Sequence, residues 1–203
     1  SLSALGVEQL DLYLLHWPMT HAAYELDDAR HAQLRLEAWR ELVELKRRGL
    51  VREVGVSNFS PRQMEALLEV EAPAVLQLEL HPLLQRKELR DFCERHGILM
   101  QAYGHYKPEL TEHPALARLV EPTPLPSLVS KPAGLLAMRW ALQAGAAAIP
   151  RSRNPLQLDA NLRLFWRGFH RVLPPHVASS LAALDVNRSL YGLHDAFVRD
   201  LIQ

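Results

Sequence analysis

The chain has little cysteine, no net charge and no long apolar run. Cys93 is the only cysteine in 203 residues, which excludes an internal disulfide and a cysteine-built zinc site. A lone cysteine is typical of a reducing compartment, so we expect a cytoplasmic protein. The 23 basic residues balance 23 acidic ones, and no apolar run reaches the roughly 20 residues that span a bilayer. Neither nucleic acid nor a membrane is therefore expected as a partner.

The first six residues lack an initiator methionine and have the pattern of a last helical turn, with Gly6 as its C-cap. We therefore expect residues 1–203 to form a single incomplete domain, either a fragment of a longer chain or a truncated gene product. The composition, with 48% hydrophobic and 23% charged residues, is that of an ordinary globular domain.

Short apolar runs with the length of strands recur along the chain. They cover residues 11–15, 51–56, 74–80, 98–103 and 146–149. Segments with helical spacing separate them; one begins at the capping box formed by Ser60 and Gln63, with Pro61 at the first helical position. This alternation predicts about five parallel strands joined by helical crossovers.

Two α/β architectures fit this order, an open doubly wound sheet and part of a (β/α)₈ TIM barrel. No Gly-x-Gly-x-x-Gly follows any strand, so the dinucleotide fingerprint of the open sheet is missing. Polar side chains instead gather at the carboxyl ends of the strands, which is the catalytic face of a barrel. We therefore expect a partial barrel, with a long loop over 107–132, where Pro, Glu and Thr abound, and a C-terminal helix and tail over 171–203.

Five motifs in chain order resemble those of the aldo-keto reductases. They are LLHWP at 14–18, VGVSNF at 54–59, Gln77 with His81-Pro82, Ala102-Tyr103, and IPRS at 149–152 followed by Asn161. The resemblance covers nearly the whole chain and implies a barrel whose three N-terminal strand-helix units are absent here. It also implies that NADPH lies extended across the C-terminal face and delivers hydride to an aldehyde or ketone.

The resemblance assigns His16 as the catalytic histidine, which orients the carbonyl group, and Trp17 as an aromatic wall of the substrate pocket. An imidazole at a strand end can donate a hydrogen bond to a carbonyl oxygen, so the role is chemically reasonable. The family's catalytic tyrosine, lysine and aspartate belong to earlier strands that this chain lacks. Activity of this chain alone is therefore doubtful.

The resemblance also places the nicotinamide end of the cofactor. Ser57, Asn58 and Gln77 match residues that hydrogen-bond the carboxamide, which offers two donors and one acceptor. In the run 74–80, Gln77 alternates with leucines and is expected to point inward, which supports this placement independently. Tyr103 matches the aromatic residue that stacks on the nicotinamide ring.

At the adenosine end, Arg151 and Ser152 match the pair that binds the 2′-phosphate, because a guanidinium makes bidentate contacts with phosphate oxygens. Asn154, Gln157 and Asn161 follow on the next helix, where the family contacts the phosphate and the adenine. Gln157 stands where many NADP-preferring members have a second arginine. We therefore expect NADPH as the cofactor, with NADH possible.

The leading hypothesis is an oxidoreductase that reduces a small-molecule aldehyde or ketone, monomeric when complete. A non-catalytic NADP(H)-binding regulatory module is the alternative. A metal-dependent barrel hydrolase would use some of the ten histidines, but such sites usually begin with His-x-His on the first strand, and the sequence has no such pair. No metal is expected.

Overall fold

The computed structural model describes residues 2–18, 28–126, 129–166 and 172–191. The chain divides into two compact units. Among the described residues, the first unit comprises 2–18, 28–78 and 87–100, and the second comprises 79–86, 101–126, 129–166 and 172–191. The single domain expected over 1–203 stays a prediction.

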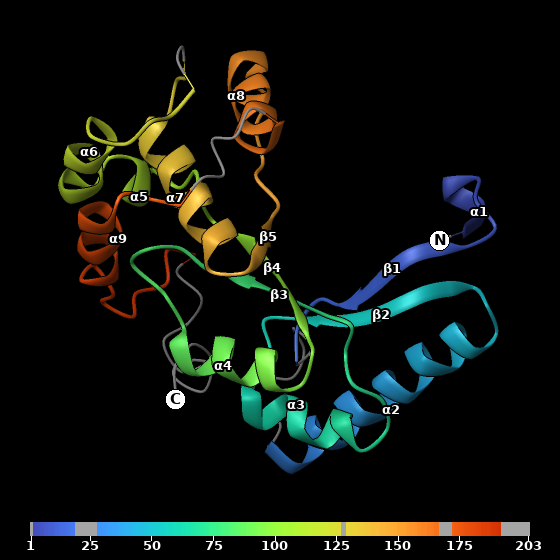
Figure 1. The fold of residues 1–203 in the computed structure, drawn as a ribbon. Helices are drawn as coiled ribbons and strands as arrows, with labels where there is room; N and C mark the ends of the chain where they lie inside the picture. The colour runs from blue at the N-terminus through green and yellow to red at the C-terminus, as the bar shows by residue number, and fades with distance from the viewer. Residues whose placement is uncertain (1, 19–27, 127–128, 167–171, 192–203) are drawn as a thin grey trace. The chain divides into compact units, whose positions relative to one another are not determined.

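Five strands alternate with helices along the chain, as the sequence predicts (Figure 1). The strands are β1 (Leu10–Leu15), β2 (Val51–Ser57), β3 (Val75–Glu79), β4 (Leu99–Tyr103) and β5 (Ala146–Ala148). They follow one another in the order β1-β2-β3-β4-β5. Strands that neighbour each other in sequence therefore also neighbour each other in the sheet, as parallel strands joined by helical crossovers do.

In the first unit, β1 and β2 pair in parallel from Leu10 opposite Val51 to Leu15 opposite Val56. Strand β3 continues the parallel pairing, with Ser57 opposite Gln77. Parallel strands end at a common edge, so the segments that follow β1, β2 and β3 leave the sheet on the same side.

The first unit also contains helices. They are α1 (Leu2–Leu5), α2 (Asp28–Arg47), α3 (Pro61–Leu68) and α4 (Lys87–Arg95). Helix α2 lies along β1, β2 and α3 (Figure 1). Its fully buried Trp39 donates through Nε1 to the Glu71 carbonyl oxygen at 3.0 Å. The predicted capping box is confirmed at α3, where Ser60 and Gln63 bond each other's backbone amides.

The second unit is mostly helical. Its helices are α5 (Pro108–Thr111), α6 (Pro114–Val120), α7 (Pro132–Gln143), α8 (Pro155–Trp166) and α9 (Pro175–Ala182). Helix α7 contacts α5, α6, α8 and β5. Leu135 and Met138 of α7 form a buried cluster with Ala160 and Leu164 of α8, which fixes the inner face of α8.

The range 107–132 differs from the loop that its composition predicts, because it contains α5 and α6. Each helix has proline at its N-terminus and buries one leucine completely, Leu110 in α5 and Leu116 in α6. Proline fixes the backbone angle that a first helical turn needs. One buried residue per helix leaves no apolar period for a sequence pattern to detect. In the C-terminal range 171–203, the helix is α9, and residues 171 and 192–203 lie outside the described residues.

Candidate functional site

In the first unit, Asn58 joins the ends of all three strands. Its side-chain Nδ2 donates to the backbone carbonyl oxygen of His16 at 3.0 Å and to Ser57 Oγ at 3.1 Å. Its backbone amide donates to the Gln77 carbonyl oxygen at 2.9 Å. Asn58 therefore brings together three other residues that the sequence predicts for the site.

The local backbone explains why asparagine suits this position. Asn58 has φ of 65°, in the left-handed region, where asparagine is tolerated far better than most residues. It is also 95% buried, and a buried amide must find hydrogen-bond partners. Ser57, which ends β2, is also buried. Ser57 and Asn58 thus form a buried, hydrogen-bonded polar turn at the strand ends.

His16 and Trp17 directly follow β1. The His16 side chain is exposed, and its ring lies 5.5 Å from the Trp17 ring at an angle of 43°. An exposed imidazole keeps its nitrogens available to a ligand. The catalytic role of His16 and the pocket role of Trp17 stay predictions.

In the second unit, Tyr103 ends β4 and meets Tyr191 edge to face, with ring centroids 5.1 Å apart. Burial raises the pKa of Tyr103 above its ordinary value, and the nearby Glu79 carboxylate raises it further. The phenol therefore stays protonated at any physiological pH. Stacking of Tyr103 on a nicotinamide ring stays a prediction.

The predicted phosphate-binding residues lead into α8. Asn154 caps this helix: its Oδ1 accepts from the backbone amides of Leu156 at 2.9 Å and Gln157 at 3.4 Å. Ser152 Oγ in turn accepts from the Asn154 amide at 3.1 Å. Arg151 is exposed and precedes the first residue of α8 by four positions, and a helix N-terminus itself favours an anion.

Gln157 and Asn161 lie on the inner face of α8 and are 98% and 95% buried. Gln157 Oε1 accepts from Ser130 Oγ and from the Lys131 backbone amide, both at 3.1 Å. Gln157 Nε2 donates to Tyr106 Oη at 2.7 Å and to Asn161 Oδ1 at 3.2 Å. Both functional atoms of Gln157 are thus engaged inside the protein. Tyr106 was not among the residues that the sequence predicts for the site.

A second polar cluster without a sequence prediction surrounds Glu79, which is 98% buried. Its carboxylate accepts from His81 Nε2 at 3.0 Å, from the Leu190 backbone amide at 2.7 Å and from Ser189 Oγ. Burial alone would raise the pKa of Glu79, but these three donors outweigh it and hold the pKa below its ordinary value. The cluster attaches the segment before Tyr191 to the end of β3.

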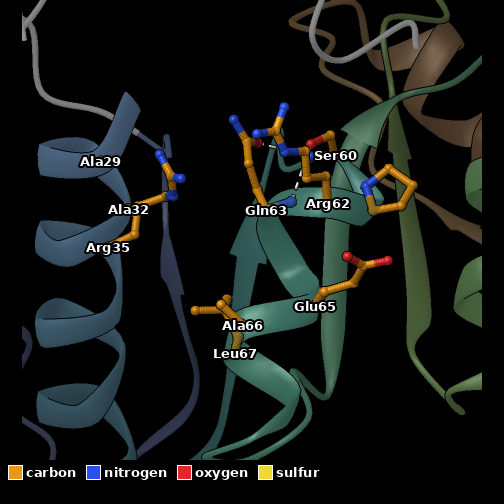
Figure 2. Close-up of a pocket in the computed structure, with 10 residues that line it drawn as sticks. Ala29, Ala32, Arg35, Ser60, Arg62, Gln63, Glu65, Ala66 and Leu67 are labelled. Atoms are coloured by element: carbon orange, nitrogen blue, oxygen red, sulfur yellow. Dashed lines mark hydrogen bonds between the residues drawn. The ribbon is translucent and has the colours of Figure 1, made fainter. Parts of the chain in front are cut away.

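An open hollow lies between the N-terminal part of α2 and helix α3 (Figure 2). Arg35 projects into it from α2, and Arg62 and Glu65 line it from α3. None of the residues predicted for the cofactor or the substrate is among its lining residues. Within the described ranges, no group of three or more His, Cys, Asp or Glu side chains could hold a metal ion. The same ranges contain no helix that is both long and apolar enough to cross a membrane.

Comparison with known proteins identifies the family. The sequence model of the Aldo/keto reductase family matches residues 1–107. An aldo-keto reductase of Mycobacterium sp. (strain JLS) is 34% identical over 168 residues, which cover 81% of this chain and 55% of the relative. Aldose reductase B of Dictyostelium discoideum is 32% identical over 183 residues, covering 81% of this chain and 57% of its own length. This chain spans about half the length of these curated relatives.

Solved structures show the same fold. An aldo/keto reductase from Brucella melitensis superposes with a TM-score of 0.73 at 31% identity, covering 91% of this chain and 64% of that one. An aldo-keto reductase complexed with NADPH gives a TM-score of 0.76 at 24% identity, covering 93% of this chain and 58% of that one. The predicted partial barrel is confirmed by these neighbours. The chain belongs to the aldo-keto reductase family, and its strands and helices form part of that family's (β/α)₈ barrel.

Proposed function

We propose that this chain binds NADPH and forms the cofactor-binding part of a reductase that converts a small aldehyde or ketone to an alcohol. The observation that carries the proposal is the arrangement around Asn58, which connects His16, Ser57 and Gln77 at the carboxyl ends of three adjacent parallel strands. Ligands of parallel α/β barrels bind at this edge. Oxidoreductase function also agrees with the family to which the chain belongs.

At the nicotinamide end, Ser57, Asn58 and Gln77 would hold the carboxamide so that one ring face meets the substrate. Buried donors and acceptors suit this task because they are fixed before the ligand arrives. Tyr103 would stack on the ring. NADPH supplies the hydride when it is bound.

His16 would donate a hydrogen bond to the carbonyl oxygen of the substrate and hold the carbonyl carbon toward the ring. The backbone of His16 is fixed by Asn58, while its side chain is exposed and can reach a ligand. Trp17, whose ring lies against His16, would form an apolar wall for the substrate. The proton that completes the alcohol needs an acid, and the family's acid is a tyrosine on an earlier strand.

At the adenosine end, the exposed Arg151 with Ser152 would bind the 2′-phosphate near the N-terminus of α8, which Asn154 caps. Asn161 Nδ2 is a buried donor with no acceptor among the described residues, as a side chain that awaits a ligand would be. Gln157 would act by orienting Asn161. Because Gln157 is neutral, we expect a weaker preference for NADPH over NADH than two arginines would give.

Two measurements on the purified protein test this function. Isothermal titration should detect NADPH binding, and stopped-flow absorbance should show whether bound NADPH transfers hydride to 4-nitrobenzaldehyde once the upstream strands of a relative are supplied in trans. Binding followed by hydride transfer supports the reductase. Binding without transfer, even in the complemented barrel, favours the regulatory module, and absence of binding contradicts the whole proposal.

A further inference from the structure

The Tyr106 ring occupies a space that is free because residue 134 is glycine and has no side chain. Gly134 lies inside α7, and a Cβ added there would overlap Cδ1 and Cε1 of the Tyr106 ring and come within 2.7 Å of the His105 carbonyl oxygen. Glycine is disfavoured inside a helix relative to alanine. Its presence here allows the tyrosine ring to lie directly against the helix backbone.

The Tyr106 hydroxyl belongs to a chain of hydrogen bonds whose direction is fixed by the backbone. The amide N–H of Lys131 can only donate, so the Gln157 atom that it meets at 3.1 Å is the oxygen. The other end of the Gln157 amide is then the nitrogen, which donates to Tyr106 Oη at 2.7 Å. The hydroxyl is left with its own hydrogen to donate, and its partner is Asn161 Oδ1.

This sequence of donors sets the orientation of the Asn161 amide. Because Tyr106 and Gln157 both donate to Oδ1, the nitrogen of Asn161 must point the other way. Asn161 is 95% buried, and Nδ2 has no acceptor among the residues that the structure describes. A buried donor without a partner is costly, and an acceptor on a bound ligand would remove this cost.

The hydroxyl keeps its hydrogen over the whole working range of pH. Burial raises the pKa of Tyr106 above its ordinary value, and the hydrogen bond from Gln157 offsets this only in part. The phenol therefore remains a donor, and the amide of Asn161 keeps one orientation.

We propose that Tyr106 is a positioning residue for the adenosine end of the cofactor, holding Asn161 so that its amide nitrogen donates to a ring nitrogen of the bound adenine. The inference rests on the proposed NADPH site. It adds a residue and a mechanism to that site: Gly134 admits the tyrosine ring, and the tyrosine hydroxyl orders the two amides of α8.

The test compares two halves of the cofactor on the purified protein. The probes are 2′,5′-ADP, which carries the adenine, and reduced nicotinamide mononucleotide, which does not. Tyr106→Phe keeps the ring against Gly134 and removes only the hydroxyl. We expect it to raise the Kd for 2′,5′-ADP about tenfold, as loss of a buried hydrogen-bond network does, with the Kd for the mononucleotide unchanged within about twofold.

A double-mutant cycle shows whether Tyr106 acts through Asn161. Asn161→Ala should weaken 2′,5′-ADP binding on its own, and adding Tyr106→Phe should cost little more, because the amide to be positioned is gone. Gly134→Ala, which displaces the ring instead of removing the hydroxyl, should again weaken 2′,5′-ADP and spare the mononucleotide. Tyr13→Phe, at an exposed tyrosine of β1, is the matched control and should leave both Kd values unchanged.

The outcomes separate the inference from the proposed function. If the wild-type protein binds neither probe nor NADPH, the proposed function is overturned. If it binds them and Tyr106→Phe leaves the Kd for 2′,5′-ADP unchanged, the positioning role alone is overturned. Equal weakening of both probes, or additive effects of Tyr106→Phe and Asn161→Ala, also overturns it, because either result marks a general structural role.

Discussion

The side-chain amide of Asn58 donates a hydrogen bond to the backbone carbonyl oxygen of His16 at 3.0 Å, joining the end of β2 to the end of β1. The two residues are 42 positions apart in the sequence. Asn58 also has a left-handed backbone, with φ of 65°. Its side chain and its backbone thus both determine where the His16 segment leaves the sheet.

These two contributions can be measured separately. Asn58→Ala should lower the free energy of unfolding by roughly 2–3 kcal/mol, because it removes a buried amide and places alanine in the left-handed region. Asn58→Gly removes the amide but tolerates the backbone angle, so it should recover about 1 kcal/mol of that loss. Urea denaturation of the three proteins gives the values. Equal stability of the two variants would mean that the backbone angle contributes nothing.

The alternation of strands and helices was predictable because each element follows its own local pattern. The Ser60 capping box is the clearest case, since both partners lie within four residues and the structure confirms them. Strand ends were also predictable, which placed His16, Ser57, Asn58 and Gln77 at one edge of the first unit. Local periodicity and the geometry of parallel strands suffice for such features.

The contacts that fix side chains could not be predicted in the same way. Glu79 meets Ser189 110 positions away, and Tyr106 meets Gln157 51 positions away. Such partners are determined by tertiary packing, which leaves no local period in the sequence. A glycine inside a helix, Gly134, was the one visible signal that a bulky ring lies close by.

His16 offers a test that separates catalysis from binding. In a barrel completed with the upstream strands, His16→Ala should lower kcat by about a hundredfold or more while the Kd for NADPH changes by less than about threefold, because the imidazole acts on the carbonyl group and not on the cofactor. Single-turnover kinetics and titration provide the two quantities. Parallel losses in both would indicate a structural histidine.

Gly55 illustrates a glycine required by a close approach between strands. A Cβ at this position would overlap the Val75 carbonyl oxygen on β3 and lie 2.8 Å from Leu14 Cδ2 on β1. Backbone on the neighbouring strand cannot move away as a side-chain tip can, so Gly55→Ala should destabilise the protein by roughly 3 kcal/mol. The midpoint of thermal unfolding reports the change.

Gly49 provides the control for Gly55. It has φ of 72°, but no atom lies within 4 Å of an added Cβ. Gly49→Ala should therefore cost only the strain of the left-handed backbone, about 1–2 kcal/mol. If the two alanine variants unfold at the same temperature, the overlap with Val75 is relieved by a backbone shift.

His105 should make the protein sensitive to mild acid. Burial, with a smaller contribution from the nearby His81, lowers its pKa from the ordinary 6.5 to about 3. Between pH 6.5 and pH 3 the unfolded chain binds a proton on His105 that the folded protein does not bind. His105 therefore leaves the free energy of unfolding unchanged above pH 6.5 and lowers it progressively as the pH decreases toward 3. The slope from one such group approaches about 1.4 kcal/mol per pH unit.

The variant His105→Leu removes the imidazole that binds this proton. The free energy of unfolding, measured with urea, should then depend less on pH between pH 6.5 and pH 5. His176→Leu is the matched control, because His176 is exposed on α9 and should leave the slope intact. An unchanged slope in His105→Leu would mean that another group takes up the proton.

Glu79 should govern stability in a lower range of pH. Its folded pKa lies below the ordinary 4.5, so its carboxylate stabilises the folded state above about pH 4.5, and this contribution is lost as pH falls through the folded pKa. Glu79→Gln keeps the shape but loses the charge that accepts from His81, Ser189 and the Leu190 amide. At pH 7 it should cost roughly 2–3 kcal/mol, the value of hydrogen bonds to a buried charged group.

The pH dependence of the stability difference between wild type and Glu79→Gln shows whether the charge of Glu79 causes that difference. Below pH 4.5 the wild-type carboxylate is progressively protonated, so the gap in unfolding free energy between wild type and Glu79→Gln should narrow as pH decreases from 4.5. Ser189→Ala removes only one of the donors and should cost about 1 kcal/mol at pH 7, with a smaller dependence on pH. Urea midpoints at a series of pH values between 7 and 3 measure all three proteins. A gap that stays constant over this range would show that packing, and not the charge of Glu79, connects the segment around Ser189 to the end of β3.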